Sequence, residues 1–253
     1  MAQRLMLVLF SAPLIAGALS LLVRRSRFSE YATVLAAIVA YLQEQGIPFD
    51  LFDADIENDK RGNLKLYFPE AEKVNISTER GLDIFVDKLF GGNKSLAVAD
   101  LGAGAGADTF PWFDKMHALL AQEGVLFTAV GVFVRDPASV ETIFSWASKL
   151  RDRVSYLIVK NERDSEDFPY FDGTPEGAKF KELAHPTIVR FERRESDIQH
   201  ELNARSLTLE QAVATTNGSM GTELKRVSTL MRMKGLKNRF EVELEKAHDL
   251  LLP

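Results

Sequence analysis

The chain has 253 residues, of which 46% are hydrophobic and 26% charged, and its formal net charge is −5. This composition is that of a folded soluble protein, and the acidic balance does not favour a protein coated in nucleic acid. The absence of cysteine excludes disulfides and thiolate zinc sites, and it fits a reducing, cytoplasmic compartment. The histidines have no ligand spacing, which argues against a histidine metal site.

Residues 1–32 form an atypical apolar segment. The run from Leu5 to Val23 contains 19 residues and no charge, and a cluster of arginines follows it. A run of this length can cross a bilayer as a helix, and the arginines would keep the rest of the chain inside. This interpretation predicts that residues 5–23 are an inner-membrane anchor with the body in the cytoplasm. The other interpretation is a buried first strand from Leu5 to Phe10, followed by an apolar helix or loop.

Beyond this segment, strand and helix signals alternate. We predict helices at 33–45, 82–89, 113–122 and 136–150, and strands at 47–53, 95–101, 125–134, 154–159 and 187–191. The stretch 59–80 reads as irregular with a short strand at 74–76, and the acidic, aromatic stretch 162–177 reads as a loop. Residues 206–253 are expected to form a helical C-terminal extension. The alternation predicts one α/β domain over residues 1–253, with a mostly parallel sheet flanked by helices.

Two of the predicted strands end in acidic residues. Asp53 and Asp55 follow the apolar run that begins at Ile47, and Asp100 ends the run that begins at Leu96. Buried parallel strands open at their C-terminal ends onto a ligand crevice, and carboxylates at such an edge commonly hold Mg²⁺ and its waters. The sequence therefore predicts that these carboxylates meet around one pocket.

The same residues carry a family resemblance. The stretch from Phe52 to Asn58 resembles the second signature of the ParA/MinD-type deviant-Walker ATPases of the P-loop class, in which an Asp-x-Asp pair follows a strand. Asp100 resembles the Walker B aspartate of that family, and Asn161 resembles its adenine-side asparagine. Residues 201–212 look like a segment of the conjugal-transfer and mobilisation relatives of ParA. The resemblance covers roughly residues 33–215.

This resemblance implies a nucleotide-dependent switch protein of plasmid transfer or partition, with ATP and Mg²⁺ as cofactors. By the resemblance, Asp55 would position or activate the attacking water, and Asp53 and Asp100 would hold Mg²⁺ through its waters. Asn161 would read the adenine edge. Members of the family commonly dimerise around ATP, so the resemblance implies a homodimer whose nucleotide state controls the binding of a protein partner that the sequence does not identify.

The phosphate loop of the family is the part that this sequence does not match. The family needs a glycine-rich loop with Gly-Lys-Ser/Thr, whose backbone N–H groups and lysine cradle the phosphates. If Thr33, our candidate for cofactor binding here, matches the final threonine, Tyr31 takes the lysine position, and the interval from Phe10 to Thr33 holds one glycine and no lysine. We expect weak or lost ATP hydrolysis, because positioning of the phosphates supplies most of the catalysis. Three explanations stay open: a degenerate relative, another binding geometry, or a replacement of residues 1–32.

The glycine-rich turn after Asp100 supports a second resemblance. The sequence from Ala99 to Gly106 is similar to motif I of the class I S-adenosylmethionine-dependent methyltransferases. Glycines in that motif let the backbone approach the cofactor, so Gly102 is a candidate cofactor-binding residue. A methyltransferase should carry an acid at the end of the next strand, about 20 residues on. Here the next predicted strand meets no acid before Asp136, which is 32 residues after Gly104.

A third interpretation is a partner-binding module without catalysis, which residues 5–23 would anchor to the membrane. Its signal is the stretch 224–239, which contains basic residues and no acid: Lys225, Arg226, Arg232, Lys234, Lys237 and Arg239. Such a face could contact DNA or an acidic partner. The competing interpretation is a solvated helix face whose charge Glu241, Glu243 and Glu245 balance.

Overall fold

The computed structural model describes residues 4–10, 30–54, 64–92, 94–101, 105–215 and 224–252. Their strands form a seven-stranded sheet in the order β3-β2-β4-β1-β5-β6-β7, in which every neighbouring pair runs parallel. The strands are β1 (Arg4–Phe10), β2 (Phe49–Asp53), β3 (Glu72–Lys73), β4 (Leu96–Leu101), β5 (Val125–Phe133), β6 (Ser155–Asn161) and β7 (Thr187–Phe191). The predicted α/β fold with a mostly parallel sheet is confirmed.

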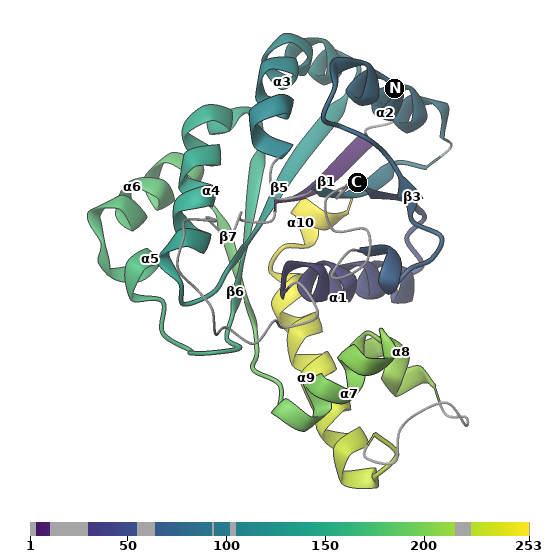
Figure 1. Cartoon of the computed structure of the whole chain (residues 1–253). Helices are drawn as coiled ribbons and strands as arrows, with labels where there is room; N and C mark the ends of the chain where they lie inside the picture. Colours follow the sequence, from purple (N-terminus) through teal and green to yellow (C-terminus); the bar gives the residue numbers. More distant parts are fainter. Residues whose placement is uncertain are drawn as a thin grey trace, which may run out of the picture.

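Helices cover both faces of this sheet (Figure 1). One face carries α2 (Glu79–Gly91), α3 (Ala105–Gln122), α4 (Pro137–Leu150), α5 (Pro169–Gly173) and α6 (Pro175–Ala184). The other face carries α1 (Glu30–Glu44), α9 (Val227–Glu245), α10 (His248–Leu251) and the short 3-10 helix η1 (Leu64–Leu66). A second 3-10 helix, η2 (Arg151–Arg153), follows α4. A third, smaller hydrophobic core joins α7 (Ser196–Arg205), α8 (Leu209–Ala214) and α9.

Strand β4 shows why the central strands read as continuous apolar runs. Ala97 and Ala99 belong to the core under α2, α3 and α4, whereas Leu96 and Val98 belong to the core under α1. Because successive side chains of a strand point to opposite faces, a strand with helices on both sides is apolar at every position. A carboxylate such as Asp100 in this pattern therefore needs a specific explanation.

Local sequence signals set the ends of two helices as predicted. Asp136 caps α4 by accepting a hydrogen bond from the backbone N–H of Ala138, and Pro137 occupies the first turn. After α1, Gly46 has a φ of 68°, a left-handed conformation that glycine adopts without strain. These caps account for the accurate prediction of both helices.

Strand β1 decides between the two interpretations of the apolar N-terminal segment. It pairs with β4 over Leu5–Phe10 and with β5 over Arg4–Phe10, so it lies inside the sheet. A single membrane helix over residues 5–23 is incompatible with this pairing, because residues hydrogen-bonded to strands on both sides are not part of a helix. In the described ranges, no helix combines the length and hydropathy that a membrane span requires. Residues 11–29 lie outside those ranges.

Helix α3 starts earlier than its sequence suggests. It begins at Ala105, whereas the predicted helix begins at residue 113, and it includes Pro111. Proline in a helix interior removes a hydrogen bond and crowds the preceding turn. Tertiary packing outweighs this local cost, because Phe110 and Trp112, on either side of the proline, are both buried in the core.

The stretch 162–177, predicted as a loop, contains α5 and the start of α6. Pro169 and Pro175 each stand in the first turn of a helix, where a missing N–H costs nothing. Thr174 caps α6 by accepting a hydrogen bond from the N–H of Gly177. A Cβ at Gly177 would lie 2.0 Å from the carbonyl oxygen of Phe171, so this tight connection requires glycine. Two other predicted bounds differ from the structure. The helical C-terminal region begins at Ser196 instead of residue 206, and β3 ends at Lys73, directly before the predicted strand at 74–76.

Candidate functional site

The connections around β1 give the C-terminal edge of the sheet the arrangement at which open α/β sheets bind ligands. The chain leaves β1 for α1 on one face, whereas the neighbouring strand β4 leads to α3 on the opposite face (Figure 1). Ligands of open α/β sheets bind where adjacent strands send their connections to opposite sides. The connections after β1, β2 and β4 include residues 11–29, 55–63 and 102–104, which lie outside the described residues. The site is therefore described from the residues at the ends of the strands.

Asp53 and Asp100 lie next to each other in this edge. They are register partners in the parallel pair of β2 and β4, and the N–H of Ala54 donates to the carbonyl oxygen of Asp100 at 2.8 Å. Adjacent strands are about 4.8 Å apart, and register partners of a parallel pair point to the same face. Both side chains are buried, with exposed fractions of 0% and 4%. The structure thus brings together two of the three predicted carboxylates, and Asp55 lies outside the described residues.

Strand alternation places both carboxylates on the α1 face of the sheet. Phe52 and Ala54 belong to the core under α2 and α3, so Asp53 between them faces the other way, as Leu51 does. Asp100 likewise lies between Ala99 and Leu101, which both belong to the core under α2 and α3. The carboxylates therefore face the side of the sheet on which α1 follows β1.

Lys73 extends this pair into a row of three charges. It is the register partner of Asp53 on β3, and its Nζ lies 3.4 Å from Asp53 Oδ2. Its side chain is 31% exposed, whereas that of Asp53 is fully buried. Sequence reasoning missed Lys73, because the stretch 59–80 has no clear periodicity and the strand that carries Lys73 has only two residues.

The two carboxylates of this row fit a hydrated Mg²⁺ ion. Mg²⁺ prefers carboxylates, both as direct ligands and as partners of its bound waters. Asp53 and Asp100 offer two carboxylates that are buried side by side on the same face of the sheet. Among the described residues, no group of three His, Cys, Asp or Glu side chains is close enough to hold a metal ion alone. Water, a nucleotide phosphate or a residue outside the described ranges, such as Asp55, would have to supply the remaining ligands.

Thr33 lies in the first turn of α1, where a phosphate loop would end. Its Oγ1 is 3.4 Å from the hydroxyl of Tyr67, which follows η1. Burial raises the pKa of the Tyr67 hydroxyl, although the hydrogen bond with Thr33 and the charge of Arg194 lower it. Gln211 of α8 donates to the carbonyl oxygen of Tyr67 at 3.2 Å. A chain of hydrogen bonds therefore links the first turn of α1 to the C-terminal helices through Tyr67, another residue that sequence reasoning missed.

Asn161 lies away from the carboxylate pair. Asp100 is level with Leu9, Val130 and Leu157 on the successive strands β1, β5 and β6, so Asn161 is four residues further along β6. Its side-chain oxygen accepts a hydrogen bond from the N–H of Arg163 at 3.2 Å, which is the ordinary turn expected by the competing interpretation. Asn161 and the carboxylates could contact opposite ends of an extended ligand, but they do not form one cluster.

The features behind the two alternative interpretations have local explanations. The acid that the methyltransferase interpretation would use, Asp136, caps α4, and Gly102 lies outside the described residues. In the basic stretch, Arg232 pairs with Glu195 at 2.5 Å, Lys237 with Glu44 at 2.7 Å, and Arg239 with Glu192 at 2.8 Å. These pairs neutralise half of the basic residues that the DNA-binding hypothesis used. The folded chain therefore gives less support to DNA binding than the sequence did.

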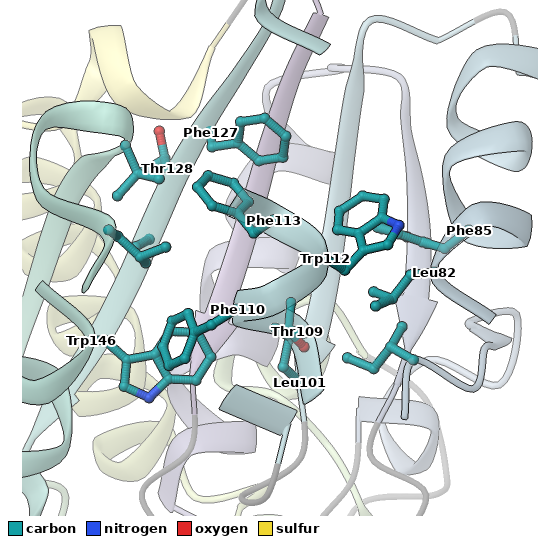
Figure 2. A pocket seen from close by; sticks show the side chains of 14 residues that line it. Leu82, Phe85, Leu101, Thr109, Phe110, Trp112, Phe113, Phe127, Thr128 and Trp146 are labelled. Carbon is teal, nitrogen blue, oxygen red and sulfur yellow. The ribbon is translucent and has the colours of Figure 1, made fainter. Parts of the chain in front are cut away.

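An apolar cavity of about 50 Å³ lies on the opposite face of the sheet, under α3 (Figure 2). Phe110 packs edge-on against Trp146 at a centroid distance of 4.4 Å, and Trp112 donates its indole N–H to Asp83. The lining is almost entirely hydrophobic, so it offers nothing to bind a charged nucleotide. The aromatic cluster after the glycine turn, Phe110, Trp112 and Phe113, is therefore core packing.

Comparisons with known proteins give no sequence family, because no family model and no curated protein matches the chain. Two solved structures are distantly similar. Chloroplast FtsY from Physcomitrella patens has a TM-score of 0.41 and 8% identity, over 62% of this chain and 50% of that chain. FlhF complexed with GTP/Mg(2+) has a TM-score of 0.39 and 12% identity, over 75% and 66%. This chain thus spans half the length of the first protein and 66% of the second. Because these scores and identities are low, the proposals below rest on the strand order and side chains of the chain itself.

Proposed function

We propose that this chain binds a nucleotide with Mg²⁺ at the C-terminal edge of its sheet and acts as a nucleotide-dependent switch. The observation that carries the proposal is the buried pair Asp53 and Asp100, in register on adjacent parallel strands and facing the side of α1. Two buried carboxylates side by side repel each other, so a site that retains both favours a cation between or beside them. In the strand order, β4 with Asp100 is next to β1, where a ligand crevice is expected.

The residues of the site have separate tasks in this proposal. Bound Mg²⁺ would neutralise part of the phosphate charge. Asp53 and Asp100 accept hydrogen bonds from waters around the metal, and the hydroxyl of Thr33 donates to a phosphate oxygen near the start of α1. Asp55 orients a water, and Asn161 contacts the base at the far end of the crevice. We infer ATP as the nucleotide, because Asn161 matches the adenine-side asparagine of the family that the sequence resembles.

The expected rate of hydrolysis is low. Phosphoryl transfer depends on fixing and neutralising the phosphates, and a phosphate loop does this with closely approaching N–H groups and a lysine. The interval between Phe10 and Thr33 has no lysine and one glycine. The chain would therefore act through binding of the nucleotide more than through turnover.

The biological role that fits these features is a ParA/MinD-like switch of plasmid transfer or partition. The support is the order of the Asp-x-Asp, Asp100 and Asn161 segments along the chain, together with the resemblance of residues 201–212. The hydrogen bonds from Thr33 through Tyr67 to Gln211 give the nucleotide site a route to the C-terminal helices. A homodimer or another protein partner that binds those helices would then respond to the nucleotide state.

Calorimetric titration tests the proposal with ATP and Mg²⁺, and with GTP and S-adenosylmethionine as competing ligands. We expect Mg²⁺-dependent ATP binding that Asp53→Asn and Asp100→Asn each weaken about tenfold or more, since each removes a charge-assisted contact. Asp50→Asn is the matched control, because Asp50 lies on the same strand but pairs with Lys94 at the other end. Binding of S-adenosylmethionine in place of ATP would contradict the proposal, as would ATP binding that neither variant changes.

A further inference from the structure

Glu210 is a buried carboxylate that the proposed nucleotide site does not use. It lies in the first turn of α8, and only 6% of its surface is exposed. Its Oε2 atom has no hydrogen-bond partner among the described residues. A buried carboxylate oxygen without a donor makes the ionised form costly, because the protein does not replace the hydrogen bonds that water would donate.

The charges around Glu210 do not offset its burial. Arg194, in the connection between β7 and α7, attracts the carboxylate, but these two described side chains do not form an ion pair. The guanidinium of Arg194 instead lies 4.6 Å from the centre of the Phe191 ring. Glu44, at the end of α1, repels the carboxylate, although Lys237 forms an ion pair with Glu44 at 2.7 Å.

The protonation of Glu210 follows from these surroundings. Burial has the largest effect, and it raises the pKa of the Glu210 carboxyl above its ordinary value of 4.5. The charge of Arg194, the hydroxyl of Thr208 and the backbone N–H of Glu210 lower that pKa, but by less than burial raises it. The folded chain therefore favours a protonated Glu210 at pH values at which an exposed glutamate is already ionised.

We propose that Glu210 is a proton-controlled latch that holds α8 against α1. With its proton, the side chain is neutral and stays buried where α8 packs. Loss of the proton leaves a negative charge that water stabilises better, so the equilibrium shifts toward separation of α8 from α1. Docking of α8 is therefore strongest below about pH 4.5, and it weakens as the pH rises through the folded-state pKa of Glu210.

The position of α8 connects this latch to the rest of the molecule. α8 packs against α1, and the residue after Glu210, Gln211, donates to the backbone carbonyl of Tyr67 at 3.2 Å. The hydroxyl of Tyr67 in turn lies 3.4 Å from Thr33 Oγ1 in the first turn of α1. Proton release by Glu210 would loosen the same helix that the proposed nucleotide site contacts, although the latch itself does not require nucleotide binding.

A carbon-13 NMR titration of the glutamate side-chain carboxyl carbons tests the inference on the unsubstituted chain. The Glu210 signal should titrate well above pH 4.5, the ordinary value for this group. Glu210→Gln removes that signal and so identifies it. A Glu210 signal that titrates at or below pH 4.5 would overturn the inference.

Amide hydrogen exchange measures the docking of α8 directly. From about pH 5 to about pH 8, protection of the α8 amides, corrected for the intrinsic pH dependence of exchange, should fall by up to about tenfold per pH unit. Glu210→Gln resembles the protonated side chain, so its protection should be high and nearly independent of pH. Asp197→Asn is the matched control, because it removes an exposed acid from the first turn of α7 and should keep the pH dependence.

The two variants separate Glu210 from other groups that titrate in this range. A pH dependence that Glu210→Gln removes and Asp197→Asn keeps supports the latch. A pH dependence that persists in Glu210→Gln assigns the effect to another group and overturns the inference, as does equal protection across the range in the unsubstituted chain. These measurements need neither ATP nor Mg²⁺, so their result is independent of the test of nucleotide binding.

Discussion

Outside the proposed site, the buried charge of Lys160 has a specific partner, the half-exposed Asp172. It accepts hydrogen bonds from Lys160 at 2.6 Å and from Lys181 at 3.2 Å. Lys160 is almost fully buried at the end of β6, where its ammonium group lies over the ring of Phe171. Burial raises the pKa of Asp172, but the two lysines more than offset this effect and hold the pKa below its ordinary value of 3.8.

We predict that Asp172→Asn destabilises the chain by about 1–3 kcal/mol at neutral pH, because it weakens a charge-assisted hydrogen bond to a buried lysine. Asp172 is itself half-exposed, which keeps the expected loss below that of a fully buried pair. The folded-state pKa is lower than the unfolded one, so this stabilisation is present above about pH 4 and is lost as the pH falls through the folded-state value.

Urea unfolding at neutral pH and near pH 3 measures this effect. The difference in the free energy of unfolding between the two chains should shrink at the lower pH. Asp167→Asn, a change at an exposed aspartate of the same segment, should have little effect at either pH. An equal difference at both pH values for Asp172→Asn would contradict the assigned cause.

The carboxylates of the site illustrate what residue-level reasoning could and could not predict. Asp53 and Asp100 were predictable, because each interrupts an apolar run at the end of a strand. Lys73, beside Asp53, and Tyr67, beside Thr33, were not predictable, because both lie in the stretch 59–80, where short turns replace periodic elements. The register that aligns Lys73, Asp53 and Asp100 depends on long-range pairing between strands, which no local pattern reveals.

At the scale of elements, the accuracy of the predictions followed the strength of local signals. β5 was predicted well, because a strand between covering helices is apolar throughout and ends at turn residues. The start of α4 was predicted from its cap. α5 and the start of α6 were missed because the acidic, aromatic composition of 162–177 indicated a loop, whereas Pro169 and Pro175 stand in the first turns of these helices.

Helix α3 allows a stability prediction that is independent of the site. Phe110 is buried against Trp146 and lines the apolar cavity, so Phe110→Ala enlarges a void that is already present. We predict a loss of about 3–5 kcal/mol, measured by urea unfolding. Lys115→Ala, a change on the same helix as Phe110, removes an exposed ion pair with Glu79 of α2 and should cost less than about 1 kcal/mol. Comparable losses for the two variants would contradict the packing described for α3.

At the scale of the whole molecule, the fold places the C-terminal helices in contact with the site instead of in a separate tail. α8 packs against α1, and Gln211 of α8 is hydrogen-bonded to the backbone of Tyr67. α9 crosses β7, and Phe240 packs edge-on against Phe191 at a centroid distance of 4.6 Å. A change at the first turn of α1 can therefore reach the surface formed by α7, α8 and α9.

We predict that Mg²⁺ and ATP slow amide hydrogen exchange in α8, because binding at the first turn of α1 would stabilise the contacts made through Tyr67. Tyr67→Phe removes the hydroxyl that contacts Thr33 but keeps the backbone bond from Gln211. In that variant the nucleotide should still bind, and exchange in α8 should respond much less. Thr142→Val, on the far face of the sheet, is a control that should leave the response intact. An unchanged response in Tyr67→Phe would show that this route does not couple the two regions.

The most direct measurement is a crystal structure of the chain grown with Mn²⁺ and ATP, with the metal located from its anomalous signal. The account predicts one metal peak on the α1 face of the sheet, in direct or water-bridged contact with both Asp53 and Asp100, and with the phosphates beside it. A metal and nucleotide bound elsewhere, with no metal near Asp53 and Asp100, would contradict the account.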